Sequence, residues 1–156
     1  MAKDMVIENS VVINKPVSQV YEYLRLMRNQ EYFSVWNMAD PDKKTTTSGI
    51  DGTERFVYSW DSQSKNVGAG SQELKKLIRD QKIEYVIRFE RPMKNIASSG
   101  FTLVPAGEGQ TRVTWDFRSP TSFPMSLFSW IFKRMLSRNM SDSLTNLKTI
   151  LEKQSA

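Results

Sequence analysis

The chain has 156 residues, of which 39% are hydrophobic and 25% are charged, and its net charge is +5. A chain of this length and composition is expected to form one globular domain, residues 1–156, with a sizeable core. It contains no cysteine and no histidine, which excludes disulfides, an ordinary zinc site and nucleophiles activated by an imidazole. Acid–base chemistry would have to come from Asp, Glu, Lys or Tyr, and neither a metal nor a cofactor is expected.

Location and partners are constrained by what the sequence lacks. No apolar run reaches the roughly 20 residues that span a bilayer, and the first letters, MAKDMVIENS, lack the apolar core of a signal peptide. A cytoplasmic location is therefore expected. Basic residues gather at 75–82 and at 133–138, but neither group has the repeated basic and aromatic pattern of a nucleic-acid module. No nucleic acid partner is expected.

The N-terminal part is predicted to form a strand from Met5 to Ile13, followed by short helices. Pro16 suits the first turn of a helix, because its missing N–H would be unpaired there. The apolar residues that follow recur at helical spacing: Val17, Val20, Tyr21 and Leu24. A second short helix is expected around residues 29–33, and the letters SVWNMADP are expected to form a loop.

From residue 54 onward the apolar residues alternate with polar ones, as they do in half-buried strands. The clearest segments are ERFVYSW, KIEYVIRFE, SGFTLVP and TRVTWDF. The short turns between successive segments predict an antiparallel meander of six or seven strands. The letters PAGEGQ are expected to form the turn of a hairpin.

Gly68 and Gly70, in the letters NVGAGSQEL, resemble the start of a phosphate-binding loop. A dinucleotide fingerprint would place a third glycine where this chain has Glu73, and it would open a helix rather than a strand. We therefore expect the two glycines to permit a bulge or a sharp bend at the beginning of a strand.

The last predicted element is a long amphipathic helix in the letters MSLFSWIFKRMLSRNMSDSLTNLKTILEK, which contain no glycine or proline. Its apolar residues recur at steps of three or four: Phe128, Phe132, Leu136, Met140, Leu144, Leu147 and Leu151. About 28 residues at 1.5 Å each give a helix of roughly 40 Å. A long helix laid across a curved antiparallel sheet is an α+β fold.

This order of elements, with one strand, two short helices, further strands and a long final helix, resembles the START-like helix-grip superfamily. More narrowly, the chain is similar to the polyketide cyclase/dehydrase and lipid-transport group that includes the birch pollen allergen. The matching segments are VVINKPVSQVYEYL, YFSVWNMADP, VGAG, TLVPAGEGQTRVTWDF and SLTNLKTILE. Together they cover nearly the whole chain.

The resemblance implies a hydrophobic cavity between the long helix and the sheet. Members of the superfamily bind lipids, sterols, polyketides or other apolar molecules there, and some cyclise or dehydrate a bound polyketide. The expected function is binding of a hydrophobic small molecule, namely a lipid, a polyketide or an aromatic compound. The alternatives are a cyclase/dehydrase-type enzyme using the same cavity, and a module that acts on a partner protein. Because a fold does not fix a reaction, no catalytic residue is named.

The residues expected to line the cavity are large side chains on the inner face of the sheet and on the long helix. They are Trp36, Tyr58, Trp60, Tyr85, Ile87, Phe89, Phe101, Leu103, Trp115, Phe117, Phe128, Phe132, Leu136 and Met140. The alternative is that these side chains simply fill the core. Arg88, Asp116 and Arg118 are expected to face outward. An inverted register would instead turn Arg88 and Asp116 inward as a binding pair.

The segment from Phe123 to Arg138 is apolar at first and basic afterwards. It is expected to be a helix start buried on two sides. One alternative is the mouth of the cavity, in contact with an entering ligand or a membrane surface. The other is the contact surface of a homodimer.

Overall fold

The computed structural model describes residues 4–64, 67–91, 94–120 and 129–154. Seven strands form one antiparallel sheet in the spatial order β1-β7-β6-β5-β4-β3-β2. Their bounds are β1 Asp4–Ile13, β2 Lys44–Ser48, β3 Val57–Asp61, β4 Ala69–Ile78, β5 Lys82–Arg91, β6 Asn95–Gly107 and β7 Gln110–Pro120. The helices are α1 Val17–Leu24, the 3-10 turn η1 Met27–Asn29, α2 Gln30–Phe33, α3 Val35–Met38 and α4 Ser129–Lys153.

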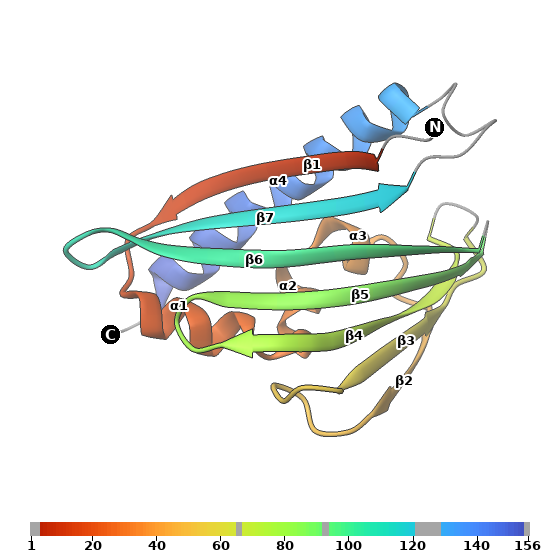
Figure 1. The fold of residues 1–156 in the computed structure, drawn as a ribbon, viewed down its shortest axis with the longest axis horizontal. Coiled ribbons are helices and arrows are strands. Elements are labelled where there is room, and N and C mark those ends of the chain that lie inside the picture. Colours follow the sequence, from red (N-terminus) through yellow and green to blue (C-terminus); the bar gives the residue numbers. More distant parts are fainter. Residues whose placement is uncertain (1–3, 65–66, 92–93, 121–128, 155–156) are drawn as a thin grey trace.

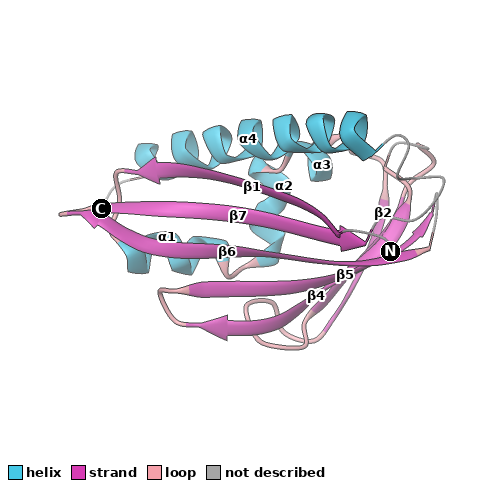
Figure 2. Cartoon of the chain, turned by 45° about the horizontal axis from the view of Figure 1, so that its top comes forward, coloured by secondary structure: helices cyan, strands magenta, loops and turns pink. Residues whose placement is uncertain are grey.

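All the helices lie on one face of the sheet. In Figure 1 the strands pass in front of α1, α2, α3 and the long α4. In Figure 2, α4 runs beside the edge strand β1, and the short helices lie further along the same face. At 1.5 Å per residue, the 25 residues of α4 span about 38 Å. This arrangement confirms the predicted α+β fold, with a long C-terminal helix held against a curved antiparallel sheet.

Two local predictions need correction. The letters SVWNMADP do not form only a loop, because residues 35–38 make the helical turn α3. Ser34 caps this turn, since its Oγ accepts a hydrogen bond from the backbone N–H of Asn37 at 3.4 Å. Strand β2 was not among the segments identified from alternation. Its letters KTTTS are exposed throughout, so it forms by pairing with β3 and carries no alternating apolar residues.

The apolar face of α4 packs as its periodicity predicts. The described members of that face are all buried: Leu136, Met140, Leu144, Leu147 and Leu151. Phe128 lies outside the described residues, as does the side chain of Phe132. On the sheet side, Phe101 stacks on Trp115 with ring centroids 4.9 Å apart. Phe33 contacts both of these rings edge-on, which joins α2 to the same core.

The glycines of NVGAGSQEL lie at a bulge at the start of β4, as predicted. Gly68 has φ of +66°, a conformation that favours glycine. The pairing of β4 with β5 shifts register between Ala69 and Gly70, and the unpaired residue of this bulge is Glu90 on the facing strand β5. A Cβ at Gly70 would lie 2.5 Å from the carbonyl oxygen of Arg88 and 2.9 Å from the ring of Trp60. Gly70 therefore lets the indole of Trp60 lie directly against the backbone.

Replacing Gly70 by alanine is expected to lower the free energy of unfolding by about 2 kcal/mol, because the new methyl group would overlap backbone atoms. Gly109→Ala is the comparison, because a Cβ at Gly109 would have no atom within 4 Å and only the backbone φ of +67° disfavours alanine there. This substitution should lower the free energy of unfolding by about 1 kcal/mol. Urea denaturation measures both. A Gly70→Ala variant no less stable than Gly109→Ala would contradict the close packing of Trp60 on Gly70.

Candidate functional site

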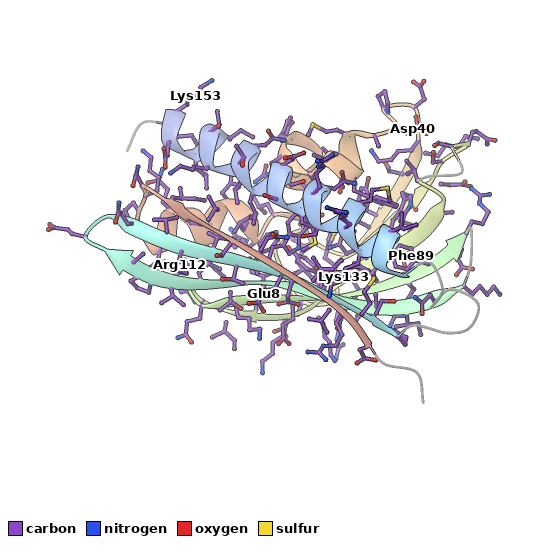
Figure 3. The ribbon with its side chains drawn as sticks, turned by 90° about the horizontal axis from the view of Figure 1, so that it is seen from above. Glu8, Asp40, Phe89, Arg112, Lys133 and Lys153 are labelled. Atoms are coloured by element: carbon purple, nitrogen blue, oxygen red, sulfur yellow. The ribbon has the colours of Figure 1, made fainter. Side chains whose placement is uncertain are left out.

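A cavity of about 100 Å³ lies between α4, the α2–α3 segment and the inner face of the sheet, and it is partly open to solvent. Figure 3 shows Asp40 and Phe89 toward one end of the molecule and Arg112 and Lys153 toward the other. Phe89 lines the cavity, so the cavity lies toward the end of the sheet that carries Phe89. Its surface is mainly apolar, and its polar groups come from the helices, from the sheet and from the α3–β2 connection.

The structure places nine of the residues named from the sequence around this cavity: Trp36, Tyr58, Trp60, Ile87, Phe89, Trp115, Phe117, Leu136 and Met140. Tyr85, Phe101 and Leu103 do not line it, because they are buried in the adjoining core. Phe128 and the side chain of Phe132 fall outside the described residues. Which of these side chains contacts a ligand stays a prediction.

Sequence reasoning missed most of the polar wall. Val67 and eight polar residues also line the cavity: Gln30, Ser34, Asn37, Lys43, Gln72, Ser99, Asn139 and Ser143. Two of them carried a usable signal, because Asn139 and Ser143 follow Leu136 and Met140 at helical spacing on α4. Lys43 carried none, since it is one of two adjacent lysines before an exposed strand.

Two of the tryptophans that line the cavity, Trp60 and Trp115, have their indole N–H groups satisfied by the protein. The Nε1 of Trp60 donates a hydrogen bond to the carbonyl oxygen of Val67 at 3.1 Å. The Nε1 of Trp115 donates to the Oγ of Ser99, also at 3.1 Å. Phe89 meets Trp60 edge-on, with ring centroids 6.0 Å apart. On the sheet side, the aromatic wall formed by Trp60, Phe89 and Trp115 therefore presents ring surface to the cavity.

A polar corner of the cavity is built from α2, the α3–β2 connection and β3. The Nζ of Lys43 donates to Oε2 of Glu31 at 2.9 Å and to the carbonyl oxygen of Asn37 at 2.8 Å. The hydroxyl of Tyr58 donates to Oε1 of the same Glu31 at 2.5 Å. Burial, followed by this hydrogen bond and the charge of Glu31, raises the pKa of Tyr58. Tyr58 therefore stays a neutral phenol at physiological pH.

A second tyrosine is buried behind the cavity without a hydrogen bond. Tyr85 is 1% exposed, and neither its hydroxyl nor the Nε2 of Gln30 has a hydrogen-bond partner among the described residues. Burial raises the pKa of Tyr85, and the neighbouring Gln30 offsets this only in part. The hydroxyl therefore costs stability, because a buried polar group without a partner is unfavourable.

Tyr85→Phe is expected to leave stability unchanged at pH 7 or to raise it by about 1 kcal/mol, whereas Tyr58→Phe should lower it by about 1–2 kcal/mol. Both pKa values are raised on folding, so the folded protein retains protons that the unfolded chain loses above about pH 10. Stability should therefore fall as the pH rises past 10, and less steeply in either variant. Urea denaturation at pH 7 and 10.5 tests this. A Tyr85→Phe variant that loses as much stability as Tyr58→Phe would contradict it.

The alternative with Arg88 and Asp116 as an inward binding pair is wrong. The pairing of β5 with β6 has no register shift, and that of β6 with β7 shifts only at Pro105 and Gly107. Alternation therefore continues undisturbed through both residues. Arg88 is exposed and donates to Oε1 of Glu73 at 2.8 Å. Asp116 lies half-buried on the outer face, where burial raises its pKa.

The expected outward position of Arg118 is confirmed, since its side chain is exposed and lies 3.6 Å from a carboxylate oxygen of Asp4. In the part of the chain that the structure describes, no three acidic side chains gather where they could hold a metal ion. No helix there is long and apolar enough to cross a membrane.

Only residues 129–138 of the segment from Phe123 to Arg138 are described, without the side chains of residues 129, 130 and 132. Residues 123–128 lie outside the described ranges. At the beginning of α4, Ile131 and Met135 are 52% and 48% exposed, and the basic Lys133 and Arg134 beside them are also exposed. The described part of the segment therefore presents apolar and basic groups to solvent and is not buried on two sides.

Comparison with solved structures finds the same fold. Norcoclaurine synthase from Thalictrum flavum, described in complex with dopamine and hydroxybenzaldehyde, has a TM-score of 0.73 at 10% identity, over 99% of this chain and 91% of that one. Protein CV1439 from Chromobacterium violaceum gives 0.66 at 15% identity, over 96% and 98%. The Aha1 dimer from Colwellia psychrerythraea gives 0.65 at 15% identity, over 97% and 99%.

At these identities the likeness shows the fold alone, and no curated protein matches the chain significantly in sequence. The family is shown by a different comparison. The family model described as polyketide cyclase / dehydrase and lipid transport matches residues 5–152, from the second residue of β1 to the penultimate residue of α4. This protein therefore belongs to the polyketide cyclase/dehydrase and lipid-transport family.

Proposed function

We propose that this protein binds a hydrophobic small molecule, namely a lipid, a polyketide or an aromatic compound, in the cavity between α4 and the sheet. The observation that carries the proposal is a mainly apolar space whose sheet side is walled by aromatic rings, with the indole N–H groups of Trp60 and Trp115 already paired. An unfilled apolar cavity costs stability, whereas an apolar pocket with a few placed polar groups is the usual form of a ligand site.

We propose that the nine cavity-lining residues predicted from the sequence contact this ligand. The family and the fold agree with such a role. Norcoclaurine synthase, which has the same fold, is described with two aromatic compounds bound. That similarity supports an aromatic ligand here without identifying it.

Two measurements test ligand binding. Organic extraction of gently purified protein, followed by mass spectrometry, should release a hydrophobic compound in a fixed ratio to protein. Melting scans with a panel of lipids and aromatic compounds should raise the melting temperature by about 5 °C for a good ligand present at a hundred times its Kd. Protein that is empty from several expression hosts, and that shifts with no compound, would contradict the proposal.

The alternative function is a cyclase/dehydrase-type enzyme in the same cavity. It is favoured by Lys43 and Tyr58, because proton transfers need ionisable side chains in the wall. Incubation with a linear polyketide precursor should then give a cyclised or dehydrated product. Lys43→Met should abolish that product, while Lys44→Met, at the exposed neighbouring lysine, should not. Identical product profiles with and without protein would contradict an enzymatic role.

Two surface contacts stay predictions, and both involve the beginning of α4. Ile131 and Met135 are exposed beside Lys133 and Arg134, a combination that suits a second copy of the chain or an anionic membrane surface. The similar Colwellia protein is described as a dimer. Analytical ultracentrifugation tests the homodimer, and flotation with anionic vesicles tests the membrane contact.

A further inference from the structure

Lys43 is a buried cation in a mainly apolar cavity wall. Its side chain is 7% exposed, whereas Lys44, the next residue, is exposed. Removing an ammonium group from water is costly unless partners compensate for the loss. The burial of the Lys43 ammonium group, next to an exposed lysine, therefore suggests that its charge serves the cavity.

One of the three N–H donors of the Lys43 ammonium group has no hydrogen-bond partner among the described residues. An ammonium group has three N–H donors. One is directed to Glu31 and a second to the backbone oxygen of Asn37. Within the described ranges the third has no partner, and Lys43 lines the cavity. This N–H is therefore available to an oxygen atom of a molecule inside the cavity.

The charges around Lys43 determine whether this N–H favours a neutral carbonyl oxygen or a carboxylate oxygen of the ligand. Glu31 already neutralises the ammonium group at 2.9 Å. A second carboxylate, Asp40, lies near enough for Lys43 to contribute to its lowered pKa, after the hydrogen bonds from Ser62 and from the backbone of Asp42. Lys43 and Glu31 thus form an ion pair that already balances its own charge. A ligand carboxylate would add a negative charge that this pair does not compensate, in a partly buried site, which is unfavourable.

The cavity volume limits the size of the group beside Lys43. About 100 Å³ is of the order of the dry cavity of about 150 Å³ that takes up a benzene molecule. Trp60, Phe89 and Trp115 supply ring surface on the sheet side of the same space. The space therefore suits one aromatic ring rather than an extended chain.

We propose, on the basis of the function proposed above, that the cavity selects a neutral aromatic carbonyl compound. Its ring lies against the aromatic wall of the sheet, and its carbonyl oxygen accepts the free N–H of Lys43. Glu31, held in place by Tyr58, keeps Lys43 neutralised and makes the site reject carboxylates.

Three compounds of nearly equal size separate these features: acetophenone has the carbonyl group, ethylbenzene lacks it, and benzoate is charged. Affinities are measured by NMR titration of the intact protein. The native protein should bind acetophenone about tenfold more tightly than ethylbenzene, because a hydrogen bond from a charged donor contributes that much. Benzoate should bind most weakly of the three.

Two substitutions and a control test the residues. Lys43→Met should lose the preference for acetophenone, about tenfold, and keep its affinity for ethylbenzene. Glu31→Gln keeps the size and shape of the side chain and one acceptor oxygen for Lys43 but removes a negative charge, so it should raise the affinity for benzoate about tenfold. Lys44→Met should behave as the native protein does. Glu31→Gln keeps the test decisive even if Lys43→Met fails to fold.

The outcomes separate this inference from the proposed function. Two results would overturn the role of Lys43 while leaving hydrophobic binding intact. One is equal affinity of the native protein for acetophenone and ethylbenzene, and the other is an affinity for benzoate that does not rise in Glu31→Gln. If none of the three compounds binds to the native protein, the proposed function fails for ligands of this size, and the inference fails with it.

Discussion

Phe101→Ala is expected to lower the free energy of unfolding by about 3–5 kcal/mol, the range for removing a large, fully buried aromatic side chain. Phe101 is 0% exposed, stacks on Trp115 and meets Phe33 and Tyr85 edge-on. It joins β6 to β7 and to α2, so its removal leaves a hole that several rigid neighbours surround. Denaturation in guanidinium chloride gives the value directly.

Phe89→Ala is the matched comparison, because Phe89 is on the same inner face but borders the cavity. It is only half-buried and part of its surface already faces empty space, so we expect a loss of about 1–2 kcal/mol. The same variant should enlarge the cavity and admit bulkier ligands. Equal losses from the two substitutions would contradict the distinction between a ring that fills the core and a ring that walls the cavity.

Met140→Trp is expected to weaken ligand binding strongly while the fold is preserved. Met140 is on α4, is 4% exposed and lines the cavity, so a larger indole there would occupy the space of the ligand ring. Burial of one ring contributes about 3 kcal/mol, and its loss should weaken binding about a hundredfold. Affinity for ethylbenzene, measured by NMR titration, reports this without depending on Lys43.

Met135→Trp is the control for that experiment. It introduces the same side chain on the same helix, at a position that is 48% exposed and is not part of the cavity wall. Its affinity should match that of the native protein. A Met140→Trp variant that folds and binds normally would place the ligand elsewhere, and a loss of affinity in Met135→Trp would point to the exposed start of α4.

Patterns that depend on local spacing predicted the fold well. The spacing of apolar residues from Leu136 to Leu151 predicted the buried face of α4. The alternation of apolar and polar residues in β5, β6 and β7 predicted which side chains lie on the inner face of the sheet. Gly68, just before β4, and Gly70, within it, predicted the bulge at the start of this strand, because glycine there commonly marks a bulge or a close approach of the backbone. These features are determined by residues close together in the chain, which is why the sequence alone was sufficient.

The polar corner of the cavity depends on contacts between distant residues. Glu31 meets Tyr58, which is 27 positions away, and it meets Lys43 through a connection that carries no regular pattern. Nothing in the letters KK distinguishes a buried lysine from an exposed one. The division between core and cavity was equally hidden, since Phe101 and Phe89 occupy equivalent inward positions and differ only in what packs against them.

The most direct test of hydrophobic binding in this cavity is methyl NMR on protein with labelled Ile, Leu and Met side chains and acetophenone added. The account predicts nuclear Overhauser contacts from the ligand ring to the methyl groups of Ile87, Leu136 and Met140. It predicts none to the exposed methyl groups of Ile131 or Met135. Contacts confined to those exposed residues, or no contacts with any labelled methyl group at saturating ligand, would contradict it.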